Sequence, residues 1–409
     1  MRIAVVCWSR RSVGGVESYL AEIAPALVSA GHDVAFWCEV DRPTERAPIT
    51  LPPGVPVMCA ETGGVDAALS DLCAWRPDLL YAHGLDDPAI EASVLTVAPS
   101  VLFLHGYYGT CISGSKTFKR PVITPCSREF GRLCLLHYFP HGCGGRSPVT
   151  MFREYRRQAM RLTNVRRYDA VVTHSTHMAA EFTKHGVSPR QVGYFASPPS
   201  VTQEVRGTDR DVWRLLFAGR MDRLKGGHVL LDALPQVRAG VDRNVRLTIA
   251  GDGPERSSLQ RQAARLEGTA SGLQIVFLGW VEPARLDVLM TEVDLLVVPS
   301  LWPEPFGSVG LSACYQGLPV VAFRVGGIPE WLTEGVNGCL APGDPPTSDS
   351  LAHAIARCLS DPRRLRSLQQ GAREIAGRFT MRAHLDALTD VFAEVVSTQQ
   401  HRPSHSVAQ

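Results

Sequence analysis

The chain has 409 residues, of which 45% are hydrophobic and 20% are charged, and its formal net charge is +2. That length exceeds one ordinary hydrophobic core and predicts two domains of about 200 residues each. The composition is that of a globular protein, and no stretch approaches the ~18 apolar residues of a membrane span. Residues 1–8 favour a first buried strand over a signal peptide, so we expect a cytoplasmic protein.

The small net charge conceals an uneven distribution. Residues 116–169 carry twelve Lys and Arg against three Asp and Glu, so the rest of the chain is net negative. Such a region suits an anionic acceptor or an anionic membrane surface, and a solvated arginine-rich face explains it equally well. A helix expected at 150–167 mixes aromatic and basic residues, which leaves open a peripheral position at the inner face of a membrane. We expect no nucleic-acid partner.

The first half of the chain alternates strand and helix signals. Strands are predicted at 3–8, 33–38, 77–84, 100–104 and 170–173, and helices at 16–30, 150–167 and 176–185. Residues 106–150 differ, because they are rich in glycine, proline and cysteine and have little periodicity. Alternation of this kind predicts βαβ units and a parallel sheet, with 106–150 as an atypical loop inserted into it.

The second half repeats the pattern after a polar linker at 197–210. Strands are predicted at 214–218, 246–250, 274–278, 294–298 and 319–323, and helices at 227–237, 254–266, 284–291, 307–316, 348–359, 362–378 and 381–396. The sequence therefore predicts an N-terminal domain at 1–200 and a C-terminal domain at 208–380, both Rossmann-like. A polar, disordered tail is expected at 397–409.

The segment 302–310 joins the buried strand at 294–298 to a helix. In open α/β sheets, ligands bind beyond the carboxyl ends of the strands. Glu304 offers a carboxylate that can accept hydrogen bonds from hydroxyl groups, and the backbone N–H groups of 306–309 lie at a helix start that favours an anion. The pair suits a ligand that is both sugar and phosphate, and an ordinary strand-to-helix turn is the alternative.

Two further segments follow strands in the same way. Gly14 and Gly15 open the first helix without the G-x-G-x-x-G spacing of a dinucleotide site, so they either admit a phosphate or sugar or only form the turn. Arg220 and Lys225 follow the first strand of the second sheet, where the guanidinium can contact two phosphate oxygens and the ammonium adds a point charge. A diphosphate leaving group needs both, although either residue alone is consistent with an exposed basic side chain.

A set of motifs resembles a known family. Five occur in the family's order: Gly219-Arg220 with Lys225-Gly226, Gly251-Asp252-Gly253-Pro254, Pro303-Glu304-Pro305-Phe306-Gly307, Gly317-Leu318-Pro319-Val320, and Gly326-Gly327-Ile328-Pro329-Glu330. They resemble glycosyltransferase family 4, the glycosyl transferases group 1, which are retaining, nucleotide-sugar-dependent enzymes. The resemblance covers most of 210–340 and extends to Gly14-Gly15-Val16-Glu17, whereas 106–168 fits poorly. It implies the GT-B fold, in which two Rossmann-like doubly wound domains face each other across a cleft and the helix at 381–396 returns to the N-terminal domain.

The resemblance also implies roles for particular residues. Arg220 and Lys225 would hold the donor diphosphate, Glu304 would bind the donor sugar, and His105 would face that sugar. Gly14 and Gly15 would let the N-terminal domain, which selects the acceptor, close on the diphosphate. The remaining donor contacts would come from the amides of Phe306, Gly307, Ser308 and Val309. Two cationic side chains at the leaving group would replace a catalytic metal.

One position departs from the family pattern. The family has a second glutamate eight residues after the first, and this chain has Ser312 there. Since that glutamate commonly binds the ribose hydroxyls, nucleotide recognition should be weaker or supplied elsewhere. We expect a retaining transfer from a UDP- or GDP-sugar to a glycan, lipid-linked or small-molecule acceptor in polysaccharide, glycolipid or glycoconjugate biosynthesis. The alternatives are a catalytically weakened GT-B-like binding or scaffold protein and a Rossmann-type oxidoreductase.

Four of the eleven cysteines cluster in the atypical loop: Cys111, Cys126, Cys134 and Cys143. In a cytosolic protein, clustered cysteines are more often metal ligands than disulfides, which suggests structural zinc. The gaps between them are long and no C-x-x-C pair is present, so buried free thiols are the competing interpretation.

Overall fold

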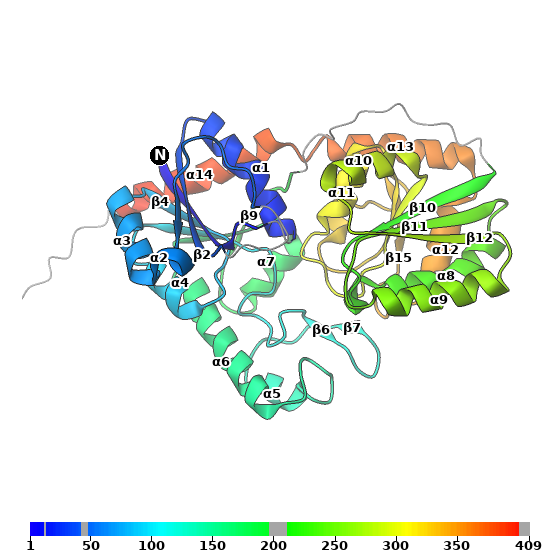
Figure 1. Cartoon of the computed structure of the whole chain (residues 1–409), viewed down its shortest axis with the longest axis horizontal. Helices are drawn as coiled ribbons and strands as arrows, with labels where there is room; N and C mark the ends of the chain where they lie inside the picture. The colour runs from blue at the N-terminus through cyan, green and yellow to red at the C-terminus, as the bar shows by residue number, and fades with distance from the viewer. Residues whose placement is uncertain (12–13, 42–47, 196–210, 401–409) are drawn as a thin grey trace, which may run out of the picture.

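The computed structural model describes residues 1–11, 14–41, 48–195 and 211–400. The chain forms two lobes, each built on a parallel sheet with helices packed against it (Figure 1). We call residues 1–195 together with the last helix the first lobe, and residues 211–380 the second lobe. The expected linker at 197–210 lies outside the described residues, as do residues 401–409 of the expected tail.

The first lobe contains a seven-stranded sheet of order β3-β2-β1-β4-β5-β8-β9, in which neighbouring strands run parallel. Alternate side chains of its central strand β1 enter opposite cores, Ile3 and Val5 on one face and Ala4 and Val6 on the other. Burial on both faces explains why these strands are continuous apolar runs. The strands are β1 (Arg2–Ser9), β2 (Asp33–Val40), β3 (Val57–Cys59), β4 (Leu79–Ala82), β5 (Ser100–Phe103), β8 (Ala170–Thr173) and β9 (Arg190–Gln191).

Six helices of the first lobe connect these strands. The sequence predicts no helix between β3 and β5, whereas three of these helices lie there. The cause is visible in α3, where only Ala68 and Leu72 are buried, so its apolar periodicity is faint. The helices are α1 (Gly15–Ser29), α2 (Ala60–Gly63), α3 (Val65–Trp75), α4 (Pro88–Val94), α6 (Pro148–Val165) and α7 (Thr176–Thr183).

The second lobe has a six-stranded parallel sheet of order β12-β11-β10-β13-β14-β15 around one large hydrophobic core. This is the doubly wound order, with the first strand β10 at the centre and β13 beside it. Its strands are β10 (Val212–Ala218), β11 (Asn244–Ala250), β12 (Leu273–Gly279), β13 (Leu295–Val298), β14 (Val320–Phe323) and β15 (Gly338–Ala341). Its α-helices are α8 (Gly227–Ala239), α9 (Arg256–Thr269), α10 (Pro283–Glu292), α11 (Ser308–Tyr315), α12 (Ser348–Leu359) and α13 (Pro362–Ala376), with short 3₁₀ helices at η1 (Arg223–Lys225) and η2 (Ile328–Glu330).

The last helix, α14 (Met381–Gln400), crosses back to the first lobe (Figure 1). Leu388 and Phe392 are fully buried in the core that α1 also lines. The hydroxyl of Tyr19 lies 2.7 Å from Nε2 of His384, which ties the start of α14 to α1.

The expectation of a disordered tail beginning at Ser397 is wrong for its first four residues, because α14 continues through Gln400. The hydroxyls of Ser397 and Thr398 donate to the carbonyl of Glu394 at 2.9 and 2.8 Å, contacts compatible with a continuing helix. No proline lies between Met381 and Gln400.

Residues 106–147 form an excursion between β5 and α6. It holds a two-stranded antiparallel sheet, β6 (Thr117–Phe118) and β7 (Thr124–Pro125), and the short helix α5 (Leu133–His137). Figure 1 shows these elements projecting below the first lobe. Its own apolar core is small and contains Ile112, Tyr138, Cys143 and Met151.

Candidate functional site

The candidate site lies where neighbouring strands of the second sheet end. β10 and β13 run parallel and side by side, so the loops that follow them leave the same edge. The loop after β10 carries Arg220 and Lys225, and the loop after β13, residues 299–307, carries Glu304. We call residues 299–307 the Glu304 loop.

The side chains of Lys225 and Glu304 are in contact. Nζ of Lys225 donates to Oε1 of Glu304 at 2.7 Å, and the hydroxyl of Ser300 donates to the same oxygen at 2.5 Å. Glu304 is only 4% exposed, whereas the Lys225 side chain is 32% exposed. Oε2 of Glu304 has no hydrogen-bond donor among the described residues, so it can accept from a ligand hydroxyl.

Glycine allows these two loops to meet. Gly226 has a φ of +72°, and a Cβ on it would lie 1.8 Å from the carbonyl oxygen of Pro299. The N–H of Leu301 donates to the carbonyl of Leu224 at 2.8 Å, which fastens the two backbones together. Any larger residue at 226 would push Lys225 away from Glu304.

The motif at 326–330 supports the Glu304 loop from the other side. Gly326 has a φ of +57°, and a Cβ there would lie 2.1 Å from the carbonyl oxygen of Glu304. The neighbouring N–H of Gly327 donates to that carbonyl at 2.7 Å. The indole of Trp331 donates to the carbonyl of Phe306 at 2.7 Å. These contacts fix the backbone that presents the carboxylate.

The N-terminus of α11 is left open. Gly307 occupies the N-cap position without a side-chain hydrogen bond. The backbone N–H groups of 306–309 have no hydrogen-bond acceptor in the described parts of the chain. Unpaired N–H groups at a helix start form an anion site, and here they adjoin the carboxylate of Glu304.

Ser312 lies in the second turn of α11. Its hydroxyl donates to the carbonyl of Ser308 at 3.3 Å, inside the helix. The side chain is half-buried and short, so it offers a ligand less than a carboxylate would.

Arg220 stands on the loop after β10 and is exposed. Its guanidinium has no partner among the described residues and is free to move toward a ligand. The loop itself is held, since the N–H of Met221 donates to the carbonyl of Asp252 at 2.8 Å. A mobile cation on a fixed backbone suits a ligand that brings its own negative charge.

The first lobe brings histidines to its own sheet edge. Nδ1 of His83 and Nε2 of His105 lie 2.8 Å apart, and one of the two carries the shared proton. Burial lowers the pKa of His83 to about 3. Burial also holds the pKa of His105 well below its usual value, so both rings are neutral near pH 7.

Two hydroxyl groups of the first lobe donate to backbone carbonyls of the Glu304 loop. The hydroxyl of Tyr107 donates to the carbonyl of Pro303 at 2.6 Å. The hydroxyl of Ser175, which caps α7, donates to the carbonyl of Pro305 at 2.7 Å. The site is therefore shared by both lobes.

Ser300, Tyr107 and Ser175 also belong to this site but were not predicted from the sequence. Each follows the carboxyl end of a parallel strand, β13, β5 and β8 respectively. That position was the available signal, because ligand-facing residues gather at this edge of such sheets.

A cavity of about 320 Å³ adjoins this edge of the first lobe. Among its lining residues are His83, His105, Tyr107, Tyr108, Gln158 and Arg161. Nε2 of His83 and Nε of Arg161 are buried without a hydrogen-bond partner in the described residues. The cavity therefore offers polar groups that a hydroxylated ligand can satisfy.

Gly14 and Gly15 lie exposed at the start of α1. A Cβ built on Gly15 would meet no described atom within 4 Å. Packing among the described residues therefore does not require glycine at position 15, which leaves approach of a ligand as a reason for it.

The four cysteines of the excursion are free thiols. Within the described residues, no group of three or more His, Cys, Asp or Glu is arranged to hold a metal ion. The thiols contact nearby chain instead, as Sγ of Cys111 does in accepting from the N–H of Lys116 at 3.3 Å, and Sγ of Cys143 in donating to the carbonyl of His137 at 3.8 Å. The structural zinc site suggested for Cys111, Cys126, Cys134 and Cys143 is thus not supported. The spacing of the cysteines along the sequence does not reveal the local contacts that each thiol makes.

Family models match both halves of the chain. Residues 13–194 match the model described as Glycosyltransferase Family 4, and residues 201–375 match the one described as Glycosyl transferases group 1. The chain belongs to glycosyltransferase family 4. The prediction of that family is confirmed.

Curated relatives agree with this family. A D-inositol 3-phosphate glycosyltransferase of Catenulispora acidiphila is 35% identical over 202 residues, which make up 48% of this chain and 48% of the relative. The chain thus spans about half the length of that relative in the match. A glycogen synthase of Mycobacterium tuberculosis is 26% identical over 91% of this chain and 90% of its own length.

Solved structures share the fold. HepE of Anabaena, solved in complex with UDP, superposes with a TM-score of 0.65 and 21% identity over 96% of this chain and all of that chain. Sucrose-phosphate synthase from Thermosynechococcus elongatus superposes with a TM-score of 0.69 and 17% identity over 97% of this chain and all of its own. The predicted GT-B arrangement of two Rossmann-like lobes is confirmed.

Proposed function

We propose that this chain transfers a sugar from a nucleoside diphosphate sugar to an acceptor hydroxyl, with retention of anomeric configuration. The observation that carries the proposal is the contact between Lys225 and Glu304, beside the open N-terminus of α11 and facing the first lobe. A carboxylate for sugar hydroxyls and a cluster of positive groups for phosphates are the two halves of such a donor.

The leaving diphosphate would be held by three kinds of positive charge. Arg220 supplies a guanidinium that can form two parallel hydrogen bonds, Lys225 an ammonium, and the start of α11 its unpaired N–H groups. Negative charge accumulates on the diphosphate as the glycosidic bond breaks, so these groups stabilise the transition state more than the bound donor. We expect the reaction to need no divalent metal for this reason.

Glu304 would orient the donor sugar through Oε2, while Lys225 and Ser300 hold its other oxygen. A UDP- or GDP-sugar is the expected donor, and the UDP complex of HepE makes UDP-sugars the first to test. Retention is expected to follow a front-face route, with the departing diphosphate acting on the incoming hydroxyl.

The acceptor would bind to the first lobe, in the cavity lined by His105, Tyr107 and Gln158. The neutral imidazole pair of His83 and His105 can donate to or accept from an uncharged hydroxyl without attracting the diphosphate away from the second lobe. A glycan, a lipid-linked sugar or a small hydroxylated molecule all fit this chemistry.

The test is a turnover assay with UDP- and GDP-sugars against a panel of hydroxylated acceptors, with the product anomer read by NMR. We expect transfer with retained configuration that persists in EDTA and falls by about 10²-fold or more in Glu304→Gln. Donor binding without transfer to any acceptor would favour the scaffold alternative, and an inverted product would overturn the stereochemical part.

A further inference from the structure

Exposed apolar side chains are concentrated in one region. In the described parts of the chain, seven of the twelve large hydrophobic residues that are exposed lie between residues 122 and 160. They are Val122, Leu133, Leu136, Phe139, Val149, Phe152 and Met160. All belong to the excursion or to α6, which pack against each other. Scattered exposed leucines are ordinary, but such a concentration marks an interaction surface.

Helix α6 separates an inner from an outer face. Successive residues of a helix are 100° apart, so Val149, Phe152, Arg153, Arg156 and Met160 fall within about 100° of one another. The apolar members of this set are exposed, with Val149 at 76%. The opposite face is buried, and it includes Met151, Gln158, Leu162 and Val165. The outer face therefore combines apolar and arginine side chains, and these side chains are exposed among the described residues.

The neighbouring helix α5 carries further exposed apolar side chains. Leu133 and Leu136 are 60% and 70% exposed and stand three residues apart, so they project together. Phe139 follows directly and is 40% exposed.

Cationic side chains are frequent in the same stretch of the chain. Seven exposed Lys and Arg lie in the same region: Lys119, Arg120, Arg128, Arg132, Arg146, Arg153 and Arg156. Of their side chains, only Arg153 has a described carboxylate partner, its neighbour Glu154 at 3.3 Å. Between residues 116 and 168 the only acids are Glu129 and Glu154. Apolar side chains among unpaired cations match the interface of an anionic bilayer, where the apolar groups enter the headgroup region and the cations meet phosphates.

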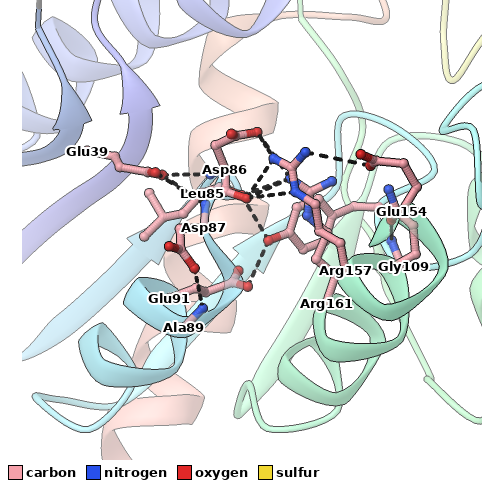
Figure 2. A network of polar contacts seen from close by, with 12 residues as sticks. Glu39, Leu85, Asp86, Asp87, Ala89, Glu91, Gly109, Glu154, Arg157 and Arg161 are labelled. Carbon is pink, nitrogen blue, oxygen red and sulfur yellow. Dashed lines mark hydrogen bonds and ion pairs between the residues drawn. The ribbon is translucent and has the colours of Figure 1, made fainter. Parts of the chain in front are cut away.

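The surface is fixed to the body of the protein. Lys116 and Glu181, each about 2% exposed, form a buried ion pair between the excursion and α7. The N–H of Phe130 donates to Nε2 of His185 at 2.8 Å. Figure 2 shows Arg157 and Arg161 of α6 facing Asp86, whose carbonyl they contact at 2.9 and 3.0 Å. A patch held this firmly can define an orientation toward a membrane.

We propose that residues 119–160 form a docking surface for an anionic membrane. The acceptor cavity draws Gln158 and Arg161 from α6, the helix that carries the docking face. Gln158 lies on the buried face of α6, so docking would hold that cavity one helix diameter, about 10 Å, behind the docking face, a depth that suits a lipid-linked hydroxyl as the acceptor class. This last step rests on the proposed function, whereas membrane docking does not.

The test is co-sedimentation of the full chain with phosphatidylcholine vesicles, with and without phosphatidylglycerol. We expect binding only to the anionic vesicles, weakened at least about tenfold in Leu133→Glu/Leu136→Glu. In Arg153→Glu/Arg156→Glu, each removed positive charge should weaken binding by about fivefold. Matched controls outside the surface are Leu278→Glu, at a leucine that is 42% exposed, and Arg363→Glu/Arg366→Glu, with the same spacing on α13.

All variants should unfold at the temperature of the parent chain, because every substituted side chain is exposed. No binding to anionic vesicles, or equal loss in the controls, overturns the proposal. So does a dimer that dissociates in Leu133→Glu/Leu136→Glu without any vesicle binding, since a second copy would then cover the surface. Vesicle binding by a chain that binds no nucleotide sugar would instead refute the proposed function and leave docking intact.

Discussion

Nζ of Lys225 and Oε1 of Glu304 lie 2.7 Å apart, although the two residues are 79 positions apart in the chain. The contact joins the loop after β10 to the loop after β13. It places a positive and a negative group side by side at one sheet edge, where a ligand with both hydroxyls and phosphates can engage each of them. Loss of either charge should therefore leave the other unbalanced in a largely buried place.

Substitution of Arg220 should affect donor binding without affecting folding. Because its side chain is exposed and has no described partner, Arg220→Ala should change the free energy of unfolding by less than about 0.5 kcal/mol. If it contacts the diphosphate, kcat/KM should fall about 10²–10³-fold. Urea unfolding and steady-state kinetics on the same preparations check both parts. Unchanged kcat/KM would remove Arg220 from the site.

Gly226 and Gly15 form a matched pair of glycines. Gly226→Ala places a methyl group against Pro299 in a left-handed conformation, and should destabilise the protein by at least about 1–3 kcal/mol. Gly15→Ala meets no described atom and should leave the free energy of unfolding unchanged. Its donor affinity should nevertheless fall if the diphosphate approaches that backbone. Thermal unfolding with and without nucleotide distinguishes the cases, and equal stability of the two variants contradicts the account.

Ser312→Glu restores a carboxylate at the position where the family has one. Ser312 is half-buried in the second turn of α11, which begins at the open N-terminus of the candidate site. The variant should fold, and should bind donor equally well or up to about tenfold more tightly through the ribose hydroxyls. Titration calorimetry measures this. Collapse of activity with donor binding intact would show that Ser312 does not occupy the ribose position.

Acid should destabilise the first lobe before the carboxylates titrate. Burial lowers the pKa of His83 to about 3 and that of His384 to about 4, from a usual value of 6.5. At a pH between the usual value of 6.5 and these lowered values, the unfolded chain binds more protons than the folded one. The contribution of the two histidines to the free energy of unfolding is therefore full above pH 6.5 and falls as the pH drops toward 4. The free energy of unfolding measured from pH 7.5 to 4 should decline over this window. His384→Gln should flatten the decline, and an identical slope in the variant contradicts the assignment.

Much of the second lobe could be predicted because its signals are local. The strand predicted at 294–298 and the helix predicted at 348–359 each depend on residues that are adjacent in the sequence. Both predictions agree with β13 and α12 within a residue or two. The strand β15, Gly338–Ala341, escaped prediction, since four residues that include glycine and cysteine carry little strand preference. Its burial comes from α12 and β14, which only the folded chain supplies.

In the candidate site, too, local motifs could be predicted from the sequence, but the contacts between distant residues could not. Glu304 and Lys225 were identifiable from motifs, yet their contact depends on how closely Gly226 packs on Pro299. Ser175 belongs to the other lobe and reaches the Glu304 loop only through the docking of the two lobes. The cysteines show the opposite case, in which a site was predicted that the described residues do not form. Proximity in sequence does not determine the direction in which each thiol points.

The central claim is tested most directly by a thermal-shift titration with UDP-, GDP- and ADP-sugars, comparing the parent chain with Arg220→Ala/Lys225→Ala. Binding to the folded state raises the unfolding temperature in step with occupancy. We predict that at least one nucleotide sugar raises the unfolding temperature of the parent chain in a concentration-dependent way, and that the double variant loses this response. If no nucleotide sugar shifts the parent chain, or if the double variant responds equally, the two cations and the carboxylate do not form a donor site.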